Sequence, residues 1–160
     1  MRDYPVVYAA INRDIEIRKY SSSGGVFFLI AKCIIEEGGV VFGAKYNDNW
    51  EVEHDFAENI NDVKSFLGSK YVQSSLGNAY FKVKSFLKED RIVLFSGTPC
   101  QIYGLKAFLG ENYSNLITVD LVCHGVPSRL VWRKYLEYRS AGREIVNVNF
   151  RDKTEGWLEF

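Results

Sequence analysis

The chain has 160 residues, of which 47% are hydrophobic and 25% are charged, a composition typical of one soluble globular domain. Its 20 Lys and Arg balance 20 Asp and Glu, so bulk charge favours neither nucleic acid nor an anionic membrane surface as a partner. The three cysteines show no disulfide-scaffold spacing, and the N-terminus lacks an apolar leader; both features favour a cytoplasmic location. The longest apolar run, 26–35, is interrupted by Lys32 and is shorter than the ~20 residues of a membrane span.

The first third of the chain predicts a strand, a helix and a second strand. Residues 6–11 form an apolar run typical of a buried strand. Residues 26–37 are apolar on nearly all sides, which predicts a buried helix that ends at the glycine pair 38–39. Residues 40–44 then predict a strand.

The middle of the chain predicts an antiparallel or edge strand and two helices. Residues 50–56 alternate incompletely between apolar and polar side chains, which favours the strand. A short helix is expected over 60–67, ending at Gly68, and apolar residues at helical spacing predict a second helix over 73–87.

The last third contains two continuous apolar runs, 92–95 and 116–119, each followed by a helix-like segment. This order indicates a βαβ unit with parallel, adjacent strands. A final helix is expected over 131–138, and strands over 147–150 and 156–160. The fold class is therefore α/β, with a mixed, largely parallel central sheet flanked by helices. Because the chain stops inside a strand-like segment, we expect a C-terminally truncated fragment.

A cysteine–proline corner at 97–101 follows the first of these runs. Thr98 fits the N-cap, Pro99 the first helical position and Gln101 the third position of a capping box. Cys100 then lies in the first helical turn, where unpaired N–H groups and the helix dipole favour a thiolate. Metal coordination and nucleophilic attack both require that form.

A second cysteine, Cys123, follows the neighbouring strand and also precedes a helix. Both thiols should face one crevice at the carboxyl end of the sheet, although burial as small hydrophobic side chains is the alternative. Two cysteines cannot complete a metal or iron–sulfur site, which takes about four protein ligands. His124 is a candidate third ligand, and the others would come from outside the chain. Cys33, within an apolar helix, is expected in the core.

Two polar loops each open a helix. Residues 21–25, Ser-Ser-Ser-Gly-Gly, suit a phosphate or, equally, a serine cap with close-packed glycines. Residues 68–74 add Lys70, which can pair with a phosphate, and Tyr71, which can stack on a ring. His54 is interpreted as a structural histidine. The basic run at 129–139 is interpreted as a solvated helix face.

Five motifs in fixed order resemble those of the coenzyme F-420 hydrogenase/dehydrogenase beta-subunit family: SSSGGVF at 21–27, GGVVFGA at 38–44, GSKYVQS at 68–74, FSGTPCQ at 95–101 and VDLVCHGVPS at 119–128. The resemblance spans about residues 6–160. It implies one FAD-binding α/β domain over 1–160 that passes electrons between a 4Fe–4S cluster and a substrate such as coenzyme F-420.

The resemblance also implies roles for individual residues. Ser22, Ser23, Gly24 and Gly25 would meet the FAD phosphates. The flavin pocket would be formed by Gly68, Ser69, Lys70, Tyr71 and Gln73, with Thr98 and Gln101 close by. Cys100 and Cys123 would be cluster ligands, while no catalytic residue is assigned.

The ferredoxin-like module and the later Cys-x-x-Cys segment of the family are absent from this sequence. We therefore expect an incomplete cluster-ligand set and a fragment that is inactive alone. The expected partners are a small-molecule redox substrate, an electron-transfer protein or ferredoxin-like module, and a second copy in a homodimer. Two alternatives stay open: a transferase or hydrolase with Cys100 as nucleophile and His124 as base, and a non-catalytic interaction domain.

Overall fold

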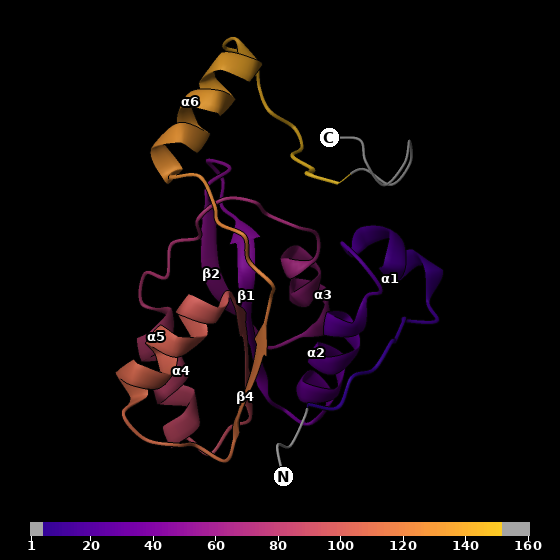
Figure 1. Ribbon diagram of the computed structural model, residues 1–160, viewed down its shortest axis with the longest axis vertical. Helices are drawn as coiled ribbons and strands as arrows, with labels where there is room; N and C mark the ends of the chain where they lie inside the picture. The colour runs from indigo at the N-terminus through magenta and orange to yellow at the C-terminus, as the bar shows by residue number, and fades with distance from the viewer. Residues whose placement is uncertain (1–4, 152–160) are drawn as a thin grey trace.

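The computed structural model describes residues 5–151, which build three layers with a four-stranded sheet in the middle (Figure 1). The strand order is β2-β1-β3-β4. β1 (Val40–Tyr46) and β3 (Val93–Gly97) are parallel, as are β3 and β4 (Leu116–Asp120), while β2 (Val52–Ala57) runs antiparallel to β1 at one edge. The predicted α/β class and the largely parallel sheet are confirmed.

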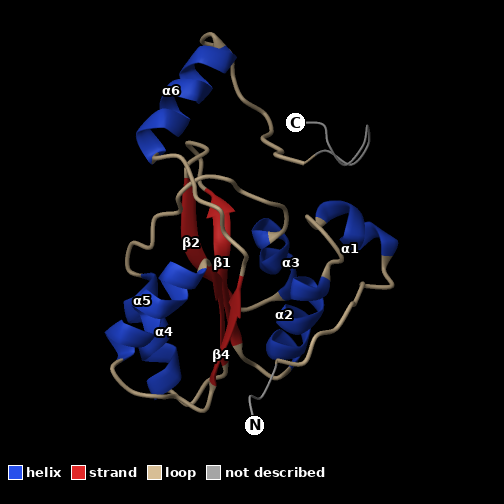
Figure 2. Ribbon diagram, viewed as in Figure 1, coloured by secondary structure: helices blue, strands red, loops and turns tan. Residues whose placement is uncertain are grey.

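Helices cover both faces of this sheet (Figure 2). α4 and α5 lie on one face, and α2, α3 and the 3₁₀ turn η1 lie on the other. α6 lies beyond the carboxyl ends of the parallel strands β1, β3 and β4 (Figure 2). The helical segments are α1 (Ile15–Tyr20), α2 (Val26–Glu36), α3 (Ile60–Val63), η1 (Lys64–Phe66), α4 (Ala79–Lys88), α5 (Pro99–Leu109) and α6 (Arg129–Ser140).

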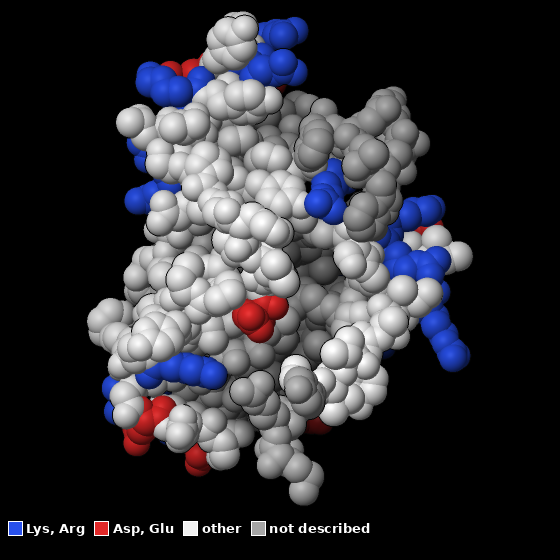
Figure 3. All heavy atoms as spheres, viewed as in Figure 1, with Lys and Arg blue, Asp and Glu red and all other residues white. Residues whose placement is uncertain are grey.

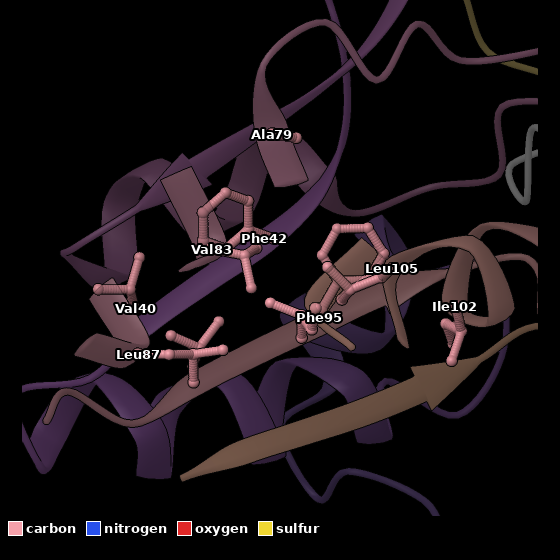
Figure 4. Close-up of a cluster of buried hydrophobic side chains, with 10 residues drawn as sticks. Val40, Phe42, Ala79, Val83, Leu87, Phe95, Ile102 and Leu105 are labelled. Atoms are coloured by element: carbon pink, nitrogen blue, oxygen red, sulfur yellow. The ribbon is translucent and has the colours of Figure 1, made fainter. Parts of the chain in front are cut away.

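The core is divided by the alternation of side chains along β1 and β3. Phe42 and Phe95 point toward α4 and α5 (Figure 4), whereas Val41 and Leu94 belong to the cluster under α2. All five residues of β3 are buried, because this strand has a neighbour on each side and helices on each face. That position explains why its sequence is a continuous apolar run rather than an alternating one.

The strand predicted at 6–11 is wrong. These residues form no strand in the described chain, and Val7 and Tyr8 are 86% and 84% exposed. The next residue, Asn12, donates its N–H to the Gly24 carbonyl over 2.7 Å, which is a contact with a loop and not with a strand. Apolar side chains favour a strand only where a neighbouring strand accepts their backbone hydrogen bonds.

The helix predicted from residue 73 begins six residues later, at Ala79. Ser75 forms a parallel bridge with Glu53 instead, donating its N–H to the Val52 carbonyl and accepting from the His54 N–H, both at 2.8 Å. This pairing with the edge strand holds residues 73–75 extended. The helices expected at 26–37, 60–67 and 131–138 are present with small shifts at their ends.

The helix α2 is buried on one side only. Phe28, Ala31 and Ile34, spaced three residues apart, face the sheet, whereas Leu29 is 40% exposed. Cys33 lies on the exposed side as well, so the prediction that it belongs to the core is wrong. An apolar neighbourhood in sequence does not bury a residue when the helix has nothing packed against that side.

Hydrogen bonds from two tryptophans connect the C-terminal part of the described chain to the loop that contains Trp50. Trp132 of α6 is buried and donates its indole N–H to the Trp50 carbonyl at 2.6 Å, while the Trp50 indole donates to the Ile145 carbonyl at 3.0 Å. Residues 147–150 form no strand, contrary to the prediction, and residues 156–160 lie outside the described range. Within residues 5–151, no helix is long and apolar enough to cross a lipid bilayer.

Candidate functional site

The first part of the candidate site is the start of α2. Gly25 occupies the N-cap position with a left-handed backbone, φ 74°, and provides no side chain to cap the helix. A Cβ atom on Gly24 would lie 2.8 Å from the Ala10 carbonyl oxygen. Gly24 therefore permits a close approach to the backbone of residues 10–11, and Gly25 provides the left-handed residue that precedes the helix.

The second part is the loop at 68–74, which lies against this helix start. The Ser69 hydroxyl donates to the Ser22 hydroxyl over 2.7 Å, joining segments 47 residues apart in sequence. Both serines are partly buried at this contact. The structure thus brings together two of the motifs that the sequence could only place in separate loops.

Lys70 is the cation of this loop. Its ammonium donates to the carbonyls of Leu67, at 2.9 Å, and Gly68, at 3.3 Å, and no carboxylate pairs with it among the described residues. Burial lowers the pKa of Lys70 to about 8, because the charged form loses solvation. A largely buried ammonium without a counter-charge is suited to receive an anion.

A buried phenol lies next to this ammonium. The Lys70 Nζ atom is 5.7 Å from the centre of the Tyr46 ring. The Tyr46 hydroxyl is itself buried without a hydrogen-bond partner in the part of the chain that the structure describes, and burial raises the pKa of Tyr46. Unsatisfied buried hydroxyls are rare in native proteins, so this phenol also has capacity for a further partner.

The rest of the loop presents side chains at the surface. Tyr71 is partly exposed, with its ring edge-on to Phe150 at 5.5 Å between centres and the Arg151 guanidinium 5.6 Å away. Gln73 is exposed. The loop therefore carries a buried cation at one point and accessible aromatic and polar groups beyond it.

The start of α5 has the predicted capping box. Thr98 is the N-cap, Pro99 is the first helical residue, and the Gln101 side-chain oxygen accepts from the Thr98 N–H at 3.0 Å. Cys100 lies in the first turn, as expected, and is exposed. The Thr98 hydroxyl lies 3.1 Å from the Cys100 sulfur, so the described neighbour of this thiol is a hydroxyl and not the imidazole of His124.

Cys123 occupies the matching position after the neighbouring strand. Gly97 of β3 is paired with Asp120 of β4, and each cysteine follows its strand residue by three positions. The Leu121 N–H donates to the Gly97 carbonyl at 3.0 Å, which extends the pairing into the loop. Cys123 is exposed, and the Gly125 N–H contacts its sulfur at 3.4 Å.

Cys100 and Cys123 are not joined by further metal-ligating side chains in the part of the chain that the structure describes. Within residues 5–151, no group of three or more His, Cys, Asp or Glu residues is placed to hold a metal ion. His124, the proposed third ligand, therefore does not complete a three-residue group with Cys100 and Cys123. These two thiols are the candidate ligands that the chain itself offers.

Sequence reasoning missed Ser74, which connects the polar loop to α5. The Gln101 amide donates to the Ser74 hydroxyl at 2.8 Å, and that hydroxyl lies 2.9 Å from Nδ1 of His54. Nε2 of His54 lies 3.0 Å from the Ser96 carbonyl. His54 is 8% exposed and fully partnered, which confirms the interpretation of a structural histidine. Ser74 had no signal in the sequence beyond its place in a polar loop.

The basic run of α6 is a solvated surface, as expected. Arg133 pairs with Glu51 and Lys134 pairs with Glu137, all on exposed or partly exposed side chains. Lys and Arg side chains gather at this end of the molecule, whereas the middle of the same face carries few charges (Figure 3). An acidic group lies near the middle of this face (Figure 3), and the last residue of β4, Asp120, is exposed.

Comparison with known proteins bears on the C-terminal part of the chain. Residues 90–160 match the model of a protein family described as the C terminus of the coenzyme F420 hydrogenase/dehydrogenase beta subunit. The resemblance to this family is confirmed over those residues. No curated protein matches the chain.

A solved structure shares the fold of this chain. The chain is similar to a chain in a structure titled "Xenon derivatization of the F420-reducing [NiFe] hydrogenase complex from Methanosarcina barkeri", with a TM-score of 0.64 and 22% sequence identity. The match covers 82% of this chain and 48% of the other. The present chain therefore spans about half the length of the one it matches, and at this identity the likeness shows the fold alone.

Proposed function

We propose that the chain is the FAD-binding domain, residues 1–160, of a flavin-dependent oxidoreductase that relays electrons between a 4Fe–4S cluster and a small acceptor such as coenzyme F-420. The observation that carries this proposal is the contact between Ser22 and Ser69, followed in the same loop by the partly buried ammonium of Lys70. Hydroxyls, glycine backbone at a helix start and an unpaired cation are the donor set that a diphosphate requires.

The residues at the start of α2 would bind the diphosphate. Gly24 and Gly25 add no side chains before the helix, and the positive end of the 11-residue α2 lies behind them. The hydroxyls of Ser22 and Ser23 would donate to phosphate oxygens. Lys70 would supply the full charge, and an anion beside it would return its pKa toward the ordinary value of 10.5.

The flavin ring would lie along the polar loop, toward the start of α5. Tyr71 offers an exposed aromatic surface. Gly68 would leave room for the ring, and the exposed side chain of Gln73 would offer it a polar contact. Thr98 and Gln101 would border the pocket from the α5 side. FAD supplies the hydride or two-electron transfer, and the protein supplies position and electrostatics.

Cys100 and Cys123 would provide two thiolates to the cluster, on matched positions after β3 and β4. An iron–sulfur cluster takes about four protein ligands, so the remaining ones would come from an electron-transfer partner or a ferredoxin-like module. We therefore expect this chain to bind flavin without turnover.

The test is FAD titration of the anaerobically purified chain, followed by flavin fluorescence and by the melting temperature. FAD should raise the melting temperature of the wild type, and Lys70→Met and Ser22→Ala should weaken binding about tenfold each if each removes one charge-assisted contact. Lys106→Met, on the exposed side of α5, is the matched control and should bind FAD normally. Absence of any FAD effect on the wild type would contradict the proposal.

A further inference from the structure

The loop at 68–74 is hydrogen-bonded at both ends to different parts of the candidate site. Near its start, Ser69 is bonded to Ser22 at the beginning of α2. Near its end, Ser74 is bonded to Gln101 at the beginning of α5. The loop thus links the two helix starts through one hydrogen bond at each end, and Ser74 at the second of these bonds also contacts the buried His54.

The hydrogen bonds around this histidine have one consistent direction. The Ser96 carbonyl can only accept, so Nε2 of His54 carries the proton, and Nδ1 of the neutral ring accepts from the Ser74 hydroxyl. Ser74 in turn accepts from the Gln101 amide, whose oxygen accepts from the Thr98 N–H. Every donor and acceptor in this chain of four bonds is used once.

His54 is held rigidly at the centre of these bonds. Its ring stacks on Phe95 with 5.3 Å between centres and 12° between planes, and burial lowers its pKa, which keeps the ring neutral. The charged groups that line a cavity of about 260 Å³ together with His54 are Glu53, Asp55 and Lys82. The neutral, stacked ring is a fixed acceptor against which Ser74 is positioned.

We propose that Ser74, held in place by His54, is a positioning residue that couples the loop at 68–74 to the first turn of α5 through its bond with Gln101. The mechanical part of this inference stands on the hydrogen bonds alone. Its functional part rests on the proposed function: flavin seated on the loop would thereby fix the start of α5, where Cys100 lies one residue before Gln101. The Cys100 thiolate and the flavin pocket would then be held in fixed positions relative to one another by one hydrogen-bond network.

The test measures the alkylation of Cys100 by iodoacetamide, with peptide mass spectrometry and the exposed Cys33 as internal reference. Because His54→Ala removes a buried ring and risks unfolding, the principal variant is Ser74→Ala. Loss of both Ser74 bonds should change the Cys100 to Cys33 rate ratio about threefold or more and weaken FAD binding by a similar factor. Ser74→Thr keeps a hydroxyl and should restore both values.

Ser75→Ala is the matched control, because the neighbouring serine enters the edge pairing through its backbone only. It should leave the rate ratio and FAD binding unchanged. A folded Ser74→Ala protein with the wild-type rate ratio would overturn the coupling. If FAD fails to bind the wild type but the rate ratio still changes, the coupling stands and the proposed flavin function falls.

Discussion

The starts of α2 and α5 belong to the same candidate site, but their exposed backbone groups are satisfied differently. α5 carries its own cap, because Gln101 accepts from the Thr98 N–H. α2 begins at Gly25, which has no side chain, and depends on neighbouring loops for its surroundings. At the start of α5, the helix's own residues cap the backbone, and the first turn presents the Cys100 thiol. At the start of α2, no side chain caps the backbone N–H groups, so they can bind an anion.

The largest expected effect follows from crowding the α2 start. Gly24→Ala would place a methyl group 2.8 Å from the Ala10 carbonyl, and overpacking against backbone costs about 2–3 kcal/mol. Chemical denaturation should show a free energy of unfolding lower by that amount. Gly110→Ala serves for comparison: Gly110 has a left-handed conformation, which Gly24 lacks, and open space around it, so backbone strain alone should cost about 1 kcal/mol there.

The α5 start should respond to the loss of its cap. Gln101→Leu removes the acceptor for the Thr98 N–H and the donor to Ser74, which should cost about 1–2 kcal/mol of unfolding free energy. Gln101→Glu keeps the acceptor and loses the donor, so it should cost about half as much. Equal stability of the Leu variant and the wild type would mean that this cap contributes nothing.

Lys70 should destabilise the unliganded chain, because its ammonium is largely buried without a carboxylate. Lys70→Met is expected to raise the free energy of unfolding at pH 7 by about 1 kcal/mol while it weakens FAD binding. Between about pH 8 and 10.5 the unfolded wild type binds more protons, so wild-type stability rises and this difference shrinks. A variant less stable than the wild type at pH 7 would contradict this account.

The smallest effect is the contribution of His54 to the pH dependence of stability. Its pKa in the folded protein is lowered from 6.5 by burial, so the unfolded state binds the proton more readily and stability falls as the pH drops below 6.5. His54→Gln should flatten this slope in urea unfolding measured from pH 7 to 5.

Local patterns in the sequence predicted the features that depend on near neighbours. The α5 capping box follows from Thr98, Pro99 and Gln101 alone, and the buried β3 follows from a continuous apolar run. The strand expected at 6–11 failed because strand formation needs a partner that the local sequence does not reveal. The burial of Cys33 failed because the packing of a helix is decided by what lies beside it.

The candidate site was predicted as separate motifs and not as one arrangement. The contact between Ser22 and Ser69 joins residues 47 positions apart, and no periodicity or spacing in the sequence predicts it. The bonds of Ser74 to His54 and Gln101 likewise join three elements through single polar atoms. Such bonds leave no periodic trace, since one hydroxyl in a polar loop has the same appearance whether or not it is used.

The shared offset of the two cysteines has a consequence for insertions and deletions. Cys100 and Cys123 each follow a paired strand residue by three positions, so their separation is set by the register of β3 and β4 and not by the chain between them. Lengthening the turn at 110–115 would leave the two thiols where they are. One extra residue at 98–99 or 121–122 would change the offset of one cysteine from its strand but not that of the other. We therefore expect natural relatives to show no insertions or deletions in these two short intervals.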